Sequence, residues 1–488
     1  MFDNSDRHAV GMGLLERMFG GSKRSEEAKK ERTKRPYFTY WVTCIQVVIF
    51  FVTVATYGFA PVGLDVKEVT AEIRMTSLSI EQVSIKDKRN MWVGPRQSDL
   101  IHLGAKYTPC MRPDPRIEAV LAADRAEESQ TACCIYNDNS GCVQTLEKDC
   151  SPTLSTWLKW TPSKLGYQNR TSGSVCGEDP KYCASPASTG SFIWKDDITE
   201  WPLCDSELNA TASDHHMMCE VVGRPCCVGI QGECIISTRE YCDFRRGYFH
   251  EEASLCSQVY CMKDICGMIT FSDPAKPDQF YRLFFSLFLH AGLLQLAITV
   301  FLQMTVMRDF EKVTGWWFMA IVYLFGGVAG SLASAIFIPY HVEAGPSGSQ
   351  FAVLAVVFVE VLRWNKDRAP GATVAKLFIV FGILFFLGMI LSDIDNFAHL
   401  FGLLFGILVC FGFRPYLTVC GAPVSDIGRL VGVAVCLLLA VALFAILVMV
   451  FYLAPVSNCH NCMYFNCIPF TSTYCDDQDV SIRNVTDA

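Results

Sequence analysis

The chain has 488 residues, of which 51% are hydrophobic and 18% charged, and its formal net charge at pH 7 is −8. Its mean hydropathy of +0.27 is high for a soluble protein, yet the charged fraction is large for a chain lying wholly in a membrane, so a multi-spanning membrane protein with a sizeable soluble part is favoured. Basic residues gather only beside apolar segments and no groove-reading motif occurs, so we expect no nucleic-acid partner.

The amino-terminal residues 1–36 are polar and hold eight lysines and arginines between Arg17 and Arg35. No cleavable signal pattern precedes the first apolar run, which extends from Tyr37 to Pro61 and is long enough to cross a bilayer as a helix. A basic flank keeps its side of a span in the cytosol. We therefore expect an uncleaved first span with a cytosolic tail, whose basic residues also suit anionic membrane lipids.

Residues 62–277 are polar and rich in cysteine, because sixteen of the 24 cysteines lie between Cys110 and Cys266. Such density indicates an oxidising compartment, where disulfides persist. Turn-rich sequence favours loops and strands there and makes long helices improbable. We expect the adjacent cysteines at 133–134 and at 226–227 each to bond elsewhere. Glycosylation acceptors agree with a lumenal location; they are Asn169, Asn209 and, near the carboxyl end, Asn484.

The sequence predicts neither a metal site nor another cofactor. The best metal candidate, Cys459-His460-Asn461-Cys462, belongs to a group of four cysteines in the tail that more readily form disulfides. His250-Glu251 lacks the second histidine, four residues on, that a metalloprotease helix requires.

Six more apolar segments follow the cysteine-rich part. Lysine and arginine occur in every second connection between them, whereas the connections 339–344 and 392–395 contain none. Counted from a cytosolic amino terminus, every basic connection falls in the cytosol, as the positive-inside rule requires. The sequence therefore predicts seven spans and a lumenal carboxyl-terminal tail. The last six predicted spans are 280–305, 315–338, 347–363, 372–391, 394–413 and 430–454.

A serine and a histidine lie at similar depth in this topology. Gly345-Pro346-Ser347-Gly348 opens one span from the lumenal side, and His399 lies about one turn into another span from the same side. A serine activated by a histidine suits nucleophilic hydrolysis, and ionisable groups inside spans are commonly functional. The alternative reading is close helix packing, for which Gly402 and Gly406 form a small-xxx-small motif.

These segments resemble those of rhomboid intramembrane serine proteases. Gly345-Pro346-Ser347-Gly348 is similar to the family's GxSG motif, and Ala398-His399-Leu400-Phe401-Gly402, with Gly406, is similar to its histidine-bearing helix. The stretch from His290 to Thr299 aligns with the family's His-x4-His-x3-Asn helix.

The resemblance is closer to one branch, the inactive rhomboids, and covers the chain from about residue 35 to its end. That branch has a large cysteine-rich lumenal domain after the first span, and Trp92-Val93-Gly94-Pro95 and Gly247–Ala253 look like its signature segments. Phe351 takes the place of the tyrosine that stacks on the catalytic histidine in active members, and Glu311 matches a glutamate that the family keeps.

The oxyanion site departs from that of the active proteases. The resemblance implies that side chains at two positions, here Gln295 and Thr299, and backbone N–H groups near the serine would stabilise the oxyanion. Pro346 has no N–H and fixes its own φ. Losing one such donor typically lowers the rate about 100- to 1000-fold. We therefore expect no catalysis, with Ser347 and His399 as a vestigial dyad.

The expected fold is a polytopic α-helical membrane protein, with a rhomboid-like core of six spans, one further C-terminal span and a large disulfide-rich lumenal domain between spans 1 and 2. Its expected parts are a cytosolic tail (1–36), the first span (37–61), the lumenal domain (62–277), the rest of the core (278–417), the last span (428–455) and a lumenal tail (456–488).

The resemblance further implies a pseudoprotease of the endoplasmic reticulum membrane, extending to the Golgi and plasma membrane. The implied clients are single-span membrane proteins, either precursors of EGF-type growth factors or a sheddase metalloprotease. The pseudoprotease would control the trafficking or degradation of these clients and would thereby regulate growth-factor signalling. Two other hypotheses stay open. One is an active intramembrane serine protease that uses Ser347 and His399; the other is a transporter or channel, although charges mark connections and not span centres.

Overall fold

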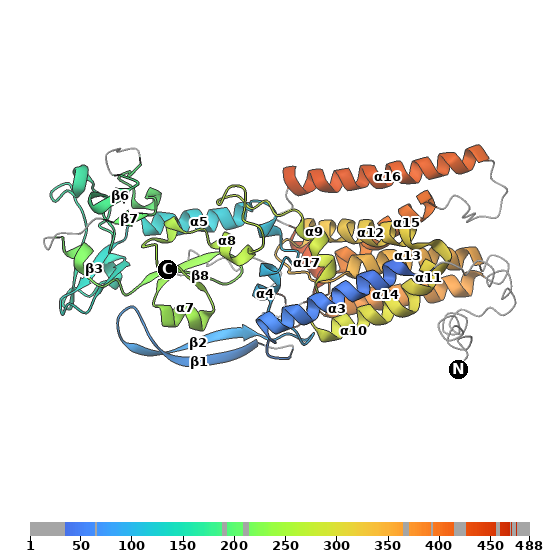
Figure 1. The fold of residues 1–488 in the computed structure, drawn as a ribbon, viewed down its shortest axis with the longest axis horizontal. Coiled ribbons are helices and arrows are strands. Elements are labelled where there is room, and N and C mark those ends of the chain that lie inside the picture. The colour runs from blue at the N-terminus through green and yellow to red at the C-terminus, as the bar shows by residue number, and fades with distance from the viewer. Residues whose placement is uncertain are drawn as a thin grey trace. The chain divides into compact units, whose positions relative to one another are not determined.

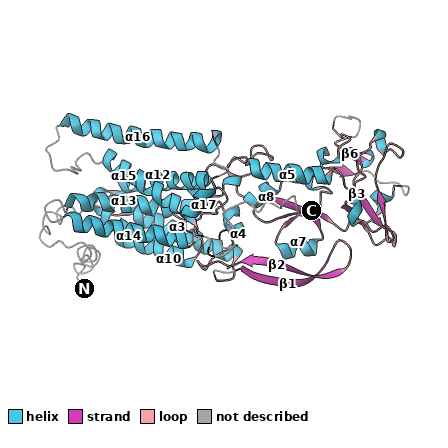
Figure 2. Ribbon diagram, turned by 180° about the vertical axis from the view of Figure 1, so that it is seen from behind, coloured by secondary structure: helices cyan, strands magenta, loops and turns pink. Residues whose placement is uncertain are grey.

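The chain divides into two compact units, shown in Figure 1. The helical unit comprises Met1–Leu64, Arg89–Arg112 and Gln279–Ser481, and the cysteine-rich unit comprises Asp65–Lys88, Pro113–Asp278 and Ile482–Ala488. The described strands all lie in the cysteine-rich unit (Figure 2). The computed structural model describes residues 35–63, 66–187, 193–207, 214–364, 370–391, 394–413, 426–454, 459–468, 470 and 475. Most of the predicted basic tail, Asn209 and Asn484 lie outside these residues.

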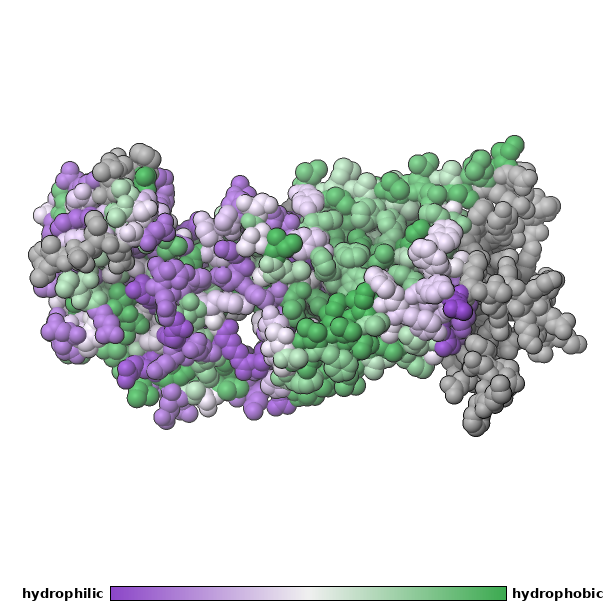
Figure 3. All heavy atoms as spheres, viewed as in Figure 1, coloured by the Kyte–Doolittle hydropathy of each residue, from purple (hydrophilic) through white to green (hydrophobic). Residues whose placement is uncertain are grey.

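Long apolar helices form the helical unit, and hydrophobic residues cover much of its visible face (Figure 3). Five segments are long and apolar enough to cross a membrane, and the described parts of α13 and α14 add two shorter apolar helices. These helices account for the seven predicted spans. The main helices are α3 (Tyr37–Tyr57), α10 (Leu293–Leu302), α12 (Trp316–Phe337), α13 (Ser347–Trp364), α14 (Pro370–Ile390), α15 (Asn396–Phe413) and α16 (Asp426–Leu453).

The second span differs from its predicted limits of 280–305. Residues 282–288 form only the short helix α9 (Arg282–Phe285) and the turn η8 (Ser286–Phe288). α10 then starts at Leu293, continues through a π-helical turn, η9 (Gln303–Met307), and ends in α11 (Arg308–Thr314). The start is fixed by hydrogen bonds, because the N–H of Leu293 donates to the carbonyl of Val93 at 2.9 Å. His290, aligned above with a helix, therefore lies before it.

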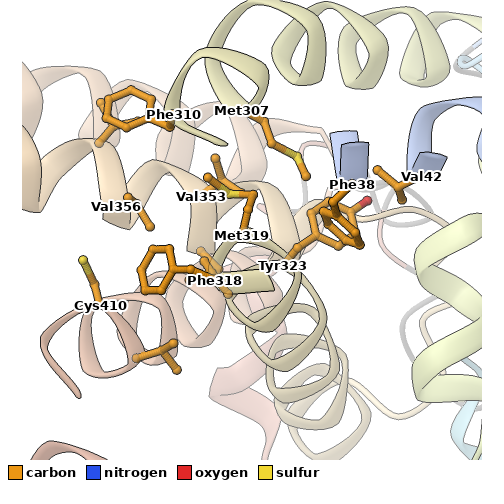
Figure 4. Close-up of a cluster of buried hydrophobic side chains, with 14 of the residues drawn as sticks. Phe38, Val42, Met307, Phe310, Phe318, Met319, Tyr323, Val353, Val356 and Cys410 are labelled. Atoms are coloured by element: carbon orange, nitrogen blue, oxygen red, sulfur yellow. The ribbon is translucent and has the colours of Figure 1, made fainter. Parts of the chain in front are cut away.

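Buried apolar side chains from several helices meet in one cluster (Figure 4). Phe38 comes from α3, Phe318 and Tyr323 from α12, Val353 from α13 and Cys410 from α15. Since lipid is as apolar as these side chains, close packing, more than removal from water, stabilises such a cluster in a membrane.

Polar groups attach α3 to the second span. The carboxylate of Glu311 accepts hydrogen bonds from the backbone N–H groups of Phe38 and Thr39, each at 2.8 Å, and from the Thr39 hydroxyl. It thereby satisfies two of the N–H groups that a helix leaves unpaired at its start. One turn further, the hydroxyl of Thr43 donates to the side chain of Gln303 at 2.6 Å.

The cysteine-rich unit consists of small antiparallel sheets and short helices. Its helix α5 (Pro115–Glu128) is longer than the sequence led us to expect, because Asp114 caps the first turn and Pro115 suits the first helical position. The sheets are the hairpin β1 (Val66–Arg74) and β2 (Ile80–Lys88); β4 (Cys142–Thr145), β3 (Ala132–Tyr136) and β5 (Ser155–Leu158); β6 (Cys183–Ser185) and β7 (Ser206–Glu207); and β10 (Tyr248–Phe249), β8 (Arg224–Val228) and β9 (Glu233–Ser237).

Disulfides hold this unit together and confirm the prediction for the adjacent cysteines. Cys133 bonds to Cys176 and Cys134 to Cys150, while Cys226 bonds to Cys242 and Cys227 to Cys261. Neither pair of neighbours is bonded to itself. Further bonds of this unit include Cys142–Cys219, Cys183–Cys204 and Cys234–Cys256, and Cys459–Cys462 and Cys467–Cys475 lie in the tail of the helical unit.

Residues 89–112, expected in the lumenal domain, cluster with the helical unit instead. The reason is a set of backbone hydrogen bonds: Lys106 and Glu343 exchange both N–H···O bonds, at 2.9 and 3.0 Å. The buried guanidinium of Arg282 also donates to the carbonyls of Ile101 and Ala105. This segment contains α4 (Gln97–His102) and the turn η2 (Thr108–Cys110).

Candidate functional site

Glycines let α13 and α15 approach until their backbones touch. A Cβ at Gly402 would lie 2.2 Å from the carbonyl oxygen of Gly348, and one at Gly406 would lie 2.6 Å from that of Ala352. No real side chain fits such distances. The small-xxx-small motif therefore serves helix packing. It also holds Ser347, one residue before Gly348, and His399, three before Gly402, on a closely packed helix pair.

Ser347 is the first residue of α13, and its hydroxyl is already engaged. It donates to Oε1 of Glu343 at 2.6 Å. The turn before it includes Gly345, whose φ of +138° is one that L side chains rarely adopt, followed by Pro346. The carbonyl of Pro346 accepts the N–H of Gln350 at 2.8 Å, so the proline continues into the first turn of the helix.

His399 lies in the first turn of α15 and packs among aromatic rings. Its imidazole stacks on Phe351 with ring centroids 3.9 Å apart and 15° between the planes, and the ring of Phe385 approaches edge-on. Phe351 thus lies where the resemblance placed a stacking aromatic ring. In the part of the chain that the structure describes, the Nδ1 atom of His399 is buried and has no hydrogen-bond partner. Among the described residues, no hydrogen bond joins His399 to Ser347, so the dyad is not assembled.

The two side chains at the oxyanion positions bond within the protein. Gln295 accepts the N–H of Ala291 at 2.7 Å and donates from Nε2 to the carbonyl of Ala344 at 2.9 Å. The hydroxyl of Thr299 accepts a hydrogen bond from the side-chain amide of Gln350 at 2.8 Å. The bond to Ala344 engages one of the two N–H bonds of the Gln295 amide, directly beside the serine-bearing turn.

Three buried charged side chains surround the start of α13 and α15. Lys106, Glu343 and Asp395 have exposed fractions of 0, 6 and 3%. The ammonium group of Lys106 donates to the carbonyl of His341 at 2.9 Å. Asp395 caps α15, since its Oδ1 accepts the N–H of Ala398 at 2.9 Å.

Burial governs the protonation of this group of charges. It raises the pKa of the Glu343 carboxyl, and the negative charge of Asp395 raises it further. Burial lowers the pKa of Lys106, while the charges of Asp395 and Glu343 oppose that shift. Unpaired buried charges are costly, so each of these three side chains depends on the others.

Two side-chain clusters have metal-like composition in the described part of the chain. In one, Cys133, Cys142 and Cys219 all belong to disulfides, and in the other Cys227 does too. Disulfide sulfur is not the thiolate that binds zinc. The remaining pair of the second cluster, His250 and Asp264, forms a hydrogen bond of 2.9 Å. Cys459 and Cys462, the candidate named from sequence, are likewise bonded to each other.

Comparison of the sequence with known proteins shows which family has this arrangement. The Rhomboid domain family matches residues 277–416, which include Gln295, Ser347 and His399. Human inactive rhomboid protein 2 is 45% identical over 498 residues, covering 98% of this chain and 57% of the relative. Inactive rhomboid protein 1 is 44% identical in Bos taurus and 42% in Danio rerio, with the same coverage. The chain contains a Rhomboid domain and is similar over 98% of its length to inactive rhomboid proteins. It spans 57% of the length of these curated relatives.

Sequence reasoning missed part of the candidate site. Lys106, Glu343 and Asp395 were not among its candidates, although Glu343 lies four residues before Ser347 and Asp395 four before His399. A carboxylate one helical turn from a candidate residue is a usable signal, because residues four apart are neighbours on a helix. Lys106 carried no such signal, since its contact with Glu343 joins positions far apart in the sequence.

Proposed function

We propose that this chain is a non-catalytic rhomboid-like pseudoprotease that binds single-span membrane proteins through its helical unit. The observation that carries the proposal is the hydrogen bond from Ser347 to Glu343, with His399 stacked on Phe351 instead of accepting from the serine. A serine nucleophile needs a base within hydrogen-bond reach and donors for the oxyanion. The names of its relatives, which call those proteins inactive, support the same conclusion.

The test of inactivity uses the full chain in lipid nanodiscs with a rhomboid substrate and a serine-directed fluorophosphonate probe. We expect neither cleavage nor labelling. The retained serine makes active proteolysis the competing hypothesis, and cleavage or labelling that disappears in Ser347→Ala would establish it. A Glu343→Gln variant then separates two possible bases. Loss of labelling in this variant but not in His399→Ala would identify the carboxyl as the base.

Client binding rests on outward-facing apolar stripes. On α10, the exposed Leu294, Ile298 and Phe301 follow helical spacing, and on α14 the exposed Ile379, Ile383 and Phe386 repeat the same spacing. In a membrane such stripes face either lipid or another helix, and side chains spaced by three and four residues suit an incoming helix. We infer that a client helix packs on these stripes.

A photo-crosslinking experiment tests this surface. A benzophenone amino acid replaces Ile298 in the full chain, and a single-span precursor of an EGF-type growth factor or a sheddase metalloprotease is co-expressed. The matched control places the same group at Leu438 of α16, which is also exposed and apolar. We expect adducts with the client from position 298 only. Equal crosslinking from both positions would mean that the contact is non-specific.

The clients and the compartment follow from the family resemblance and the cysteines. We propose a location in the endoplasmic reticulum and later secretory membranes, with a cytosolic amino terminus and control of client trafficking or degradation. The disulfide-rich unit suits an oxidising lumen. Asn169 is exposed in the structure. Removal of N-glycans by endoglycosidase should increase the mobility of the chain on a gel. Each of the variants Asn169→Gln, Asn209→Gln and Asn484→Gln should remove part of that change. A chain without any N-glycan would contradict the proposed lumenal location of these three residues.

A further inference from the structure

The segment after α16 returns to the helical unit and packs there as a short folded element. It contains α17 (His460–Asn466) and two disulfides, Cys459–Cys462 and Cys467–Cys475. Asn466 and Cys467 are fully buried, and Cys475 is nearly so. We call the described residues from Cys459 to Cys475 the C-terminal strap; Figure 1 shows α17 among the helices of this unit.

The helix that the strap contacts, α14, is otherwise weakly held. Among its residues with described side chains, only Gly388 is buried. Large apolar side chains of α14 face outward on several sides, including Phe378, Ile379 and Phe386. A helix with few buried side chains gains little from packing, so its position depends on its remaining contacts.

Phe378 and Phe381 of α14 pack against aromatic rings of α13, whereas the hydrogen bonds that α14 accepts from the strap and from α15 lie at its carboxyl end. The carbonyl of Met389, one of the last groups that a helix leaves unpaired, accepts the N–H of Ile468 in the strap at 2.9 Å. The carbonyl of Phe385 accepts from the side-chain amide of Asn396 at 3.1 Å. A Cβ at Gly388 would lie 2.0 Å from Oδ1 of Asn396, so glycine permits this close approach.

The strap also completes the start of α15. The backbone N–H of Asn396, the first residue of α15, donates to Oδ1 of Asn466 at 2.8 Å, and its side-chain amide donates to the carbonyl of Phe465 at 2.9 Å. The ring of Phe465 packs edge-on against Phe397, with centroids 5.0 Å apart, and also contacts Phe385 of α14. Strap, α14 and α15 are thus joined at one point, three residues before His399.

We propose that the C-terminal strap is a fastening that holds the end of α14 against α15, and that its release lets α14 move away. The Cys467–Cys475 disulfide begins directly after Phe465 and Asn466, the two strap residues that bond to Asn396. Because α14 carries one of the two stripes assigned to the client, release of the strap would change access for a client helix; this last consequence alone rests on the proposed function.

Hydrogen exchange measured by mass spectrometry tests the fastening without any client. The full chain is kept in lipid nanodiscs, and peptides covering residues 383–391 are compared with peptides from α12. Asn466→Ala removes the acceptor for Asn396, and we expect exchange at the end of α14 to rise about tenfold while α12 stays as slow as before. The matched control is Tyr464→Ala, which truncates an exposed side chain on the same short helix and should leave exchange unchanged.

A second variant keeps the test decisive if Asn466→Ala misfolds, which faster exchange throughout α12 would reveal. Cys467→Ser with Cys475→Ser opens the strap by another route and should produce the same local rise. Exchange at 383–391 that equals the wild type in a folded Asn466→Ala or double-serine variant would overturn the proposal. Since no client is present, that failure is distinct from a failure of client binding at Ile298.

Discussion

The hydroxyl of Ser347 donates to the carboxyl of Glu343, one helical turn before it, while the imidazole of His399 stacks on Phe351. The two residues that resemble a catalytic dyad therefore each have another partner. We therefore expect the serine to have a structural role at the start of α13 and the histidine to contribute an aromatic surface inside α15. A protein of this design can keep both side chains without using either for chemistry.

Ser347→Ala should lower the free energy of unfolding by about 1 kcal/mol, because it removes one hydrogen bond to a buried carboxyl, and it should leave client capture unchanged. Thermal unfolding in nanodiscs and co-purification of the client measure the two effects. Ser349→Ala is the matched control. The hydroxyl of Ser349 is buried with no partner in the described part of the chain, so its removal should cost no stability. Loss of client capture in Ser347→Ala alone would contradict a merely structural serine.

Gly402→Ala should destabilise the helical unit by about 2–3 kcal/mol or more, because its Cβ would lie 2.2 Å from the carbonyl oxygen of Gly348 and backbone cannot yield easily. Gly432→Ala in α16 is the control. It meets nothing within 4 Å and should be neutral or slightly stabilising through better helix propensity. Denaturation midpoints of the two variants measure the difference. Equal midpoints would show that α13 and α15 are less closely packed than described.

Glu311→Ala should cost about 2–3 kcal/mol, since the N–H groups of Phe38 and Thr39 would lose their acceptor inside the protein. Asp309→Ala, two residues earlier, removes only partly exposed ion pairs with Arg308 and Lys312 and should cost no more than about 1 kcal/mol. Hydrogen exchange at the first turn of α3 localises the effect. A uniform loss of protection, without a focus at that turn, would argue against a capping role.

His250 gives the cysteine-rich unit a pH dependence of defined sign. Its ring nitrogens lie 2.9 Å from Asp264 and 2.8 Å from Glu252, and the hydrogen bond to Asp264, followed by that to Glu252, raises the pKa of His250 despite burial. Because the folded protein binds this proton more tightly than the unfolded chain, the added stability is complete below about pH 6.5. It is lost as pH rises through the raised pKa.

Thermal unfolding between pH 6 and pH 8.5 measures this effect. The midpoint of the cysteine-rich unit should fall across that range in the wild type, and the fall should be smaller in His250→Gln. His215→Gln, at an exposed histidine, serves as the control and should behave as the wild type. A wild-type midpoint that rises with pH would refute the assignment.

The apolar runs predicted the spans because length and hydropathy alone decide whether a helix can cross a bilayer. The adjacent cysteines were also foreseen, since neighbouring residues seldom bond to each other. The start of α10 was not, because it depends on the carbonyl of Val93, which lies 200 residues earlier in the chain. For the same reason Lys106 was missed: partners distant in sequence leave no local pattern. The vestigial reading of Ser347 and His399 remains a prediction that the labelling experiment decides.

Lys106 has a consequence for how this protein can be dissected. A deletion from residue 62 to residue 277, the limits that the sequence suggests for the lumenal domain, would also take away Lys106 and its backbone ladder with Glu343. Two buried carboxyls would then lose their nearby cation, and the helical unit would be damaged from within. Loss of function after such an excision would report on the membrane core. Removal of residues 65–88 and 113–278, with 89–112 retained, would delete most of the cysteine-rich unit and keep Lys106 in the helical unit.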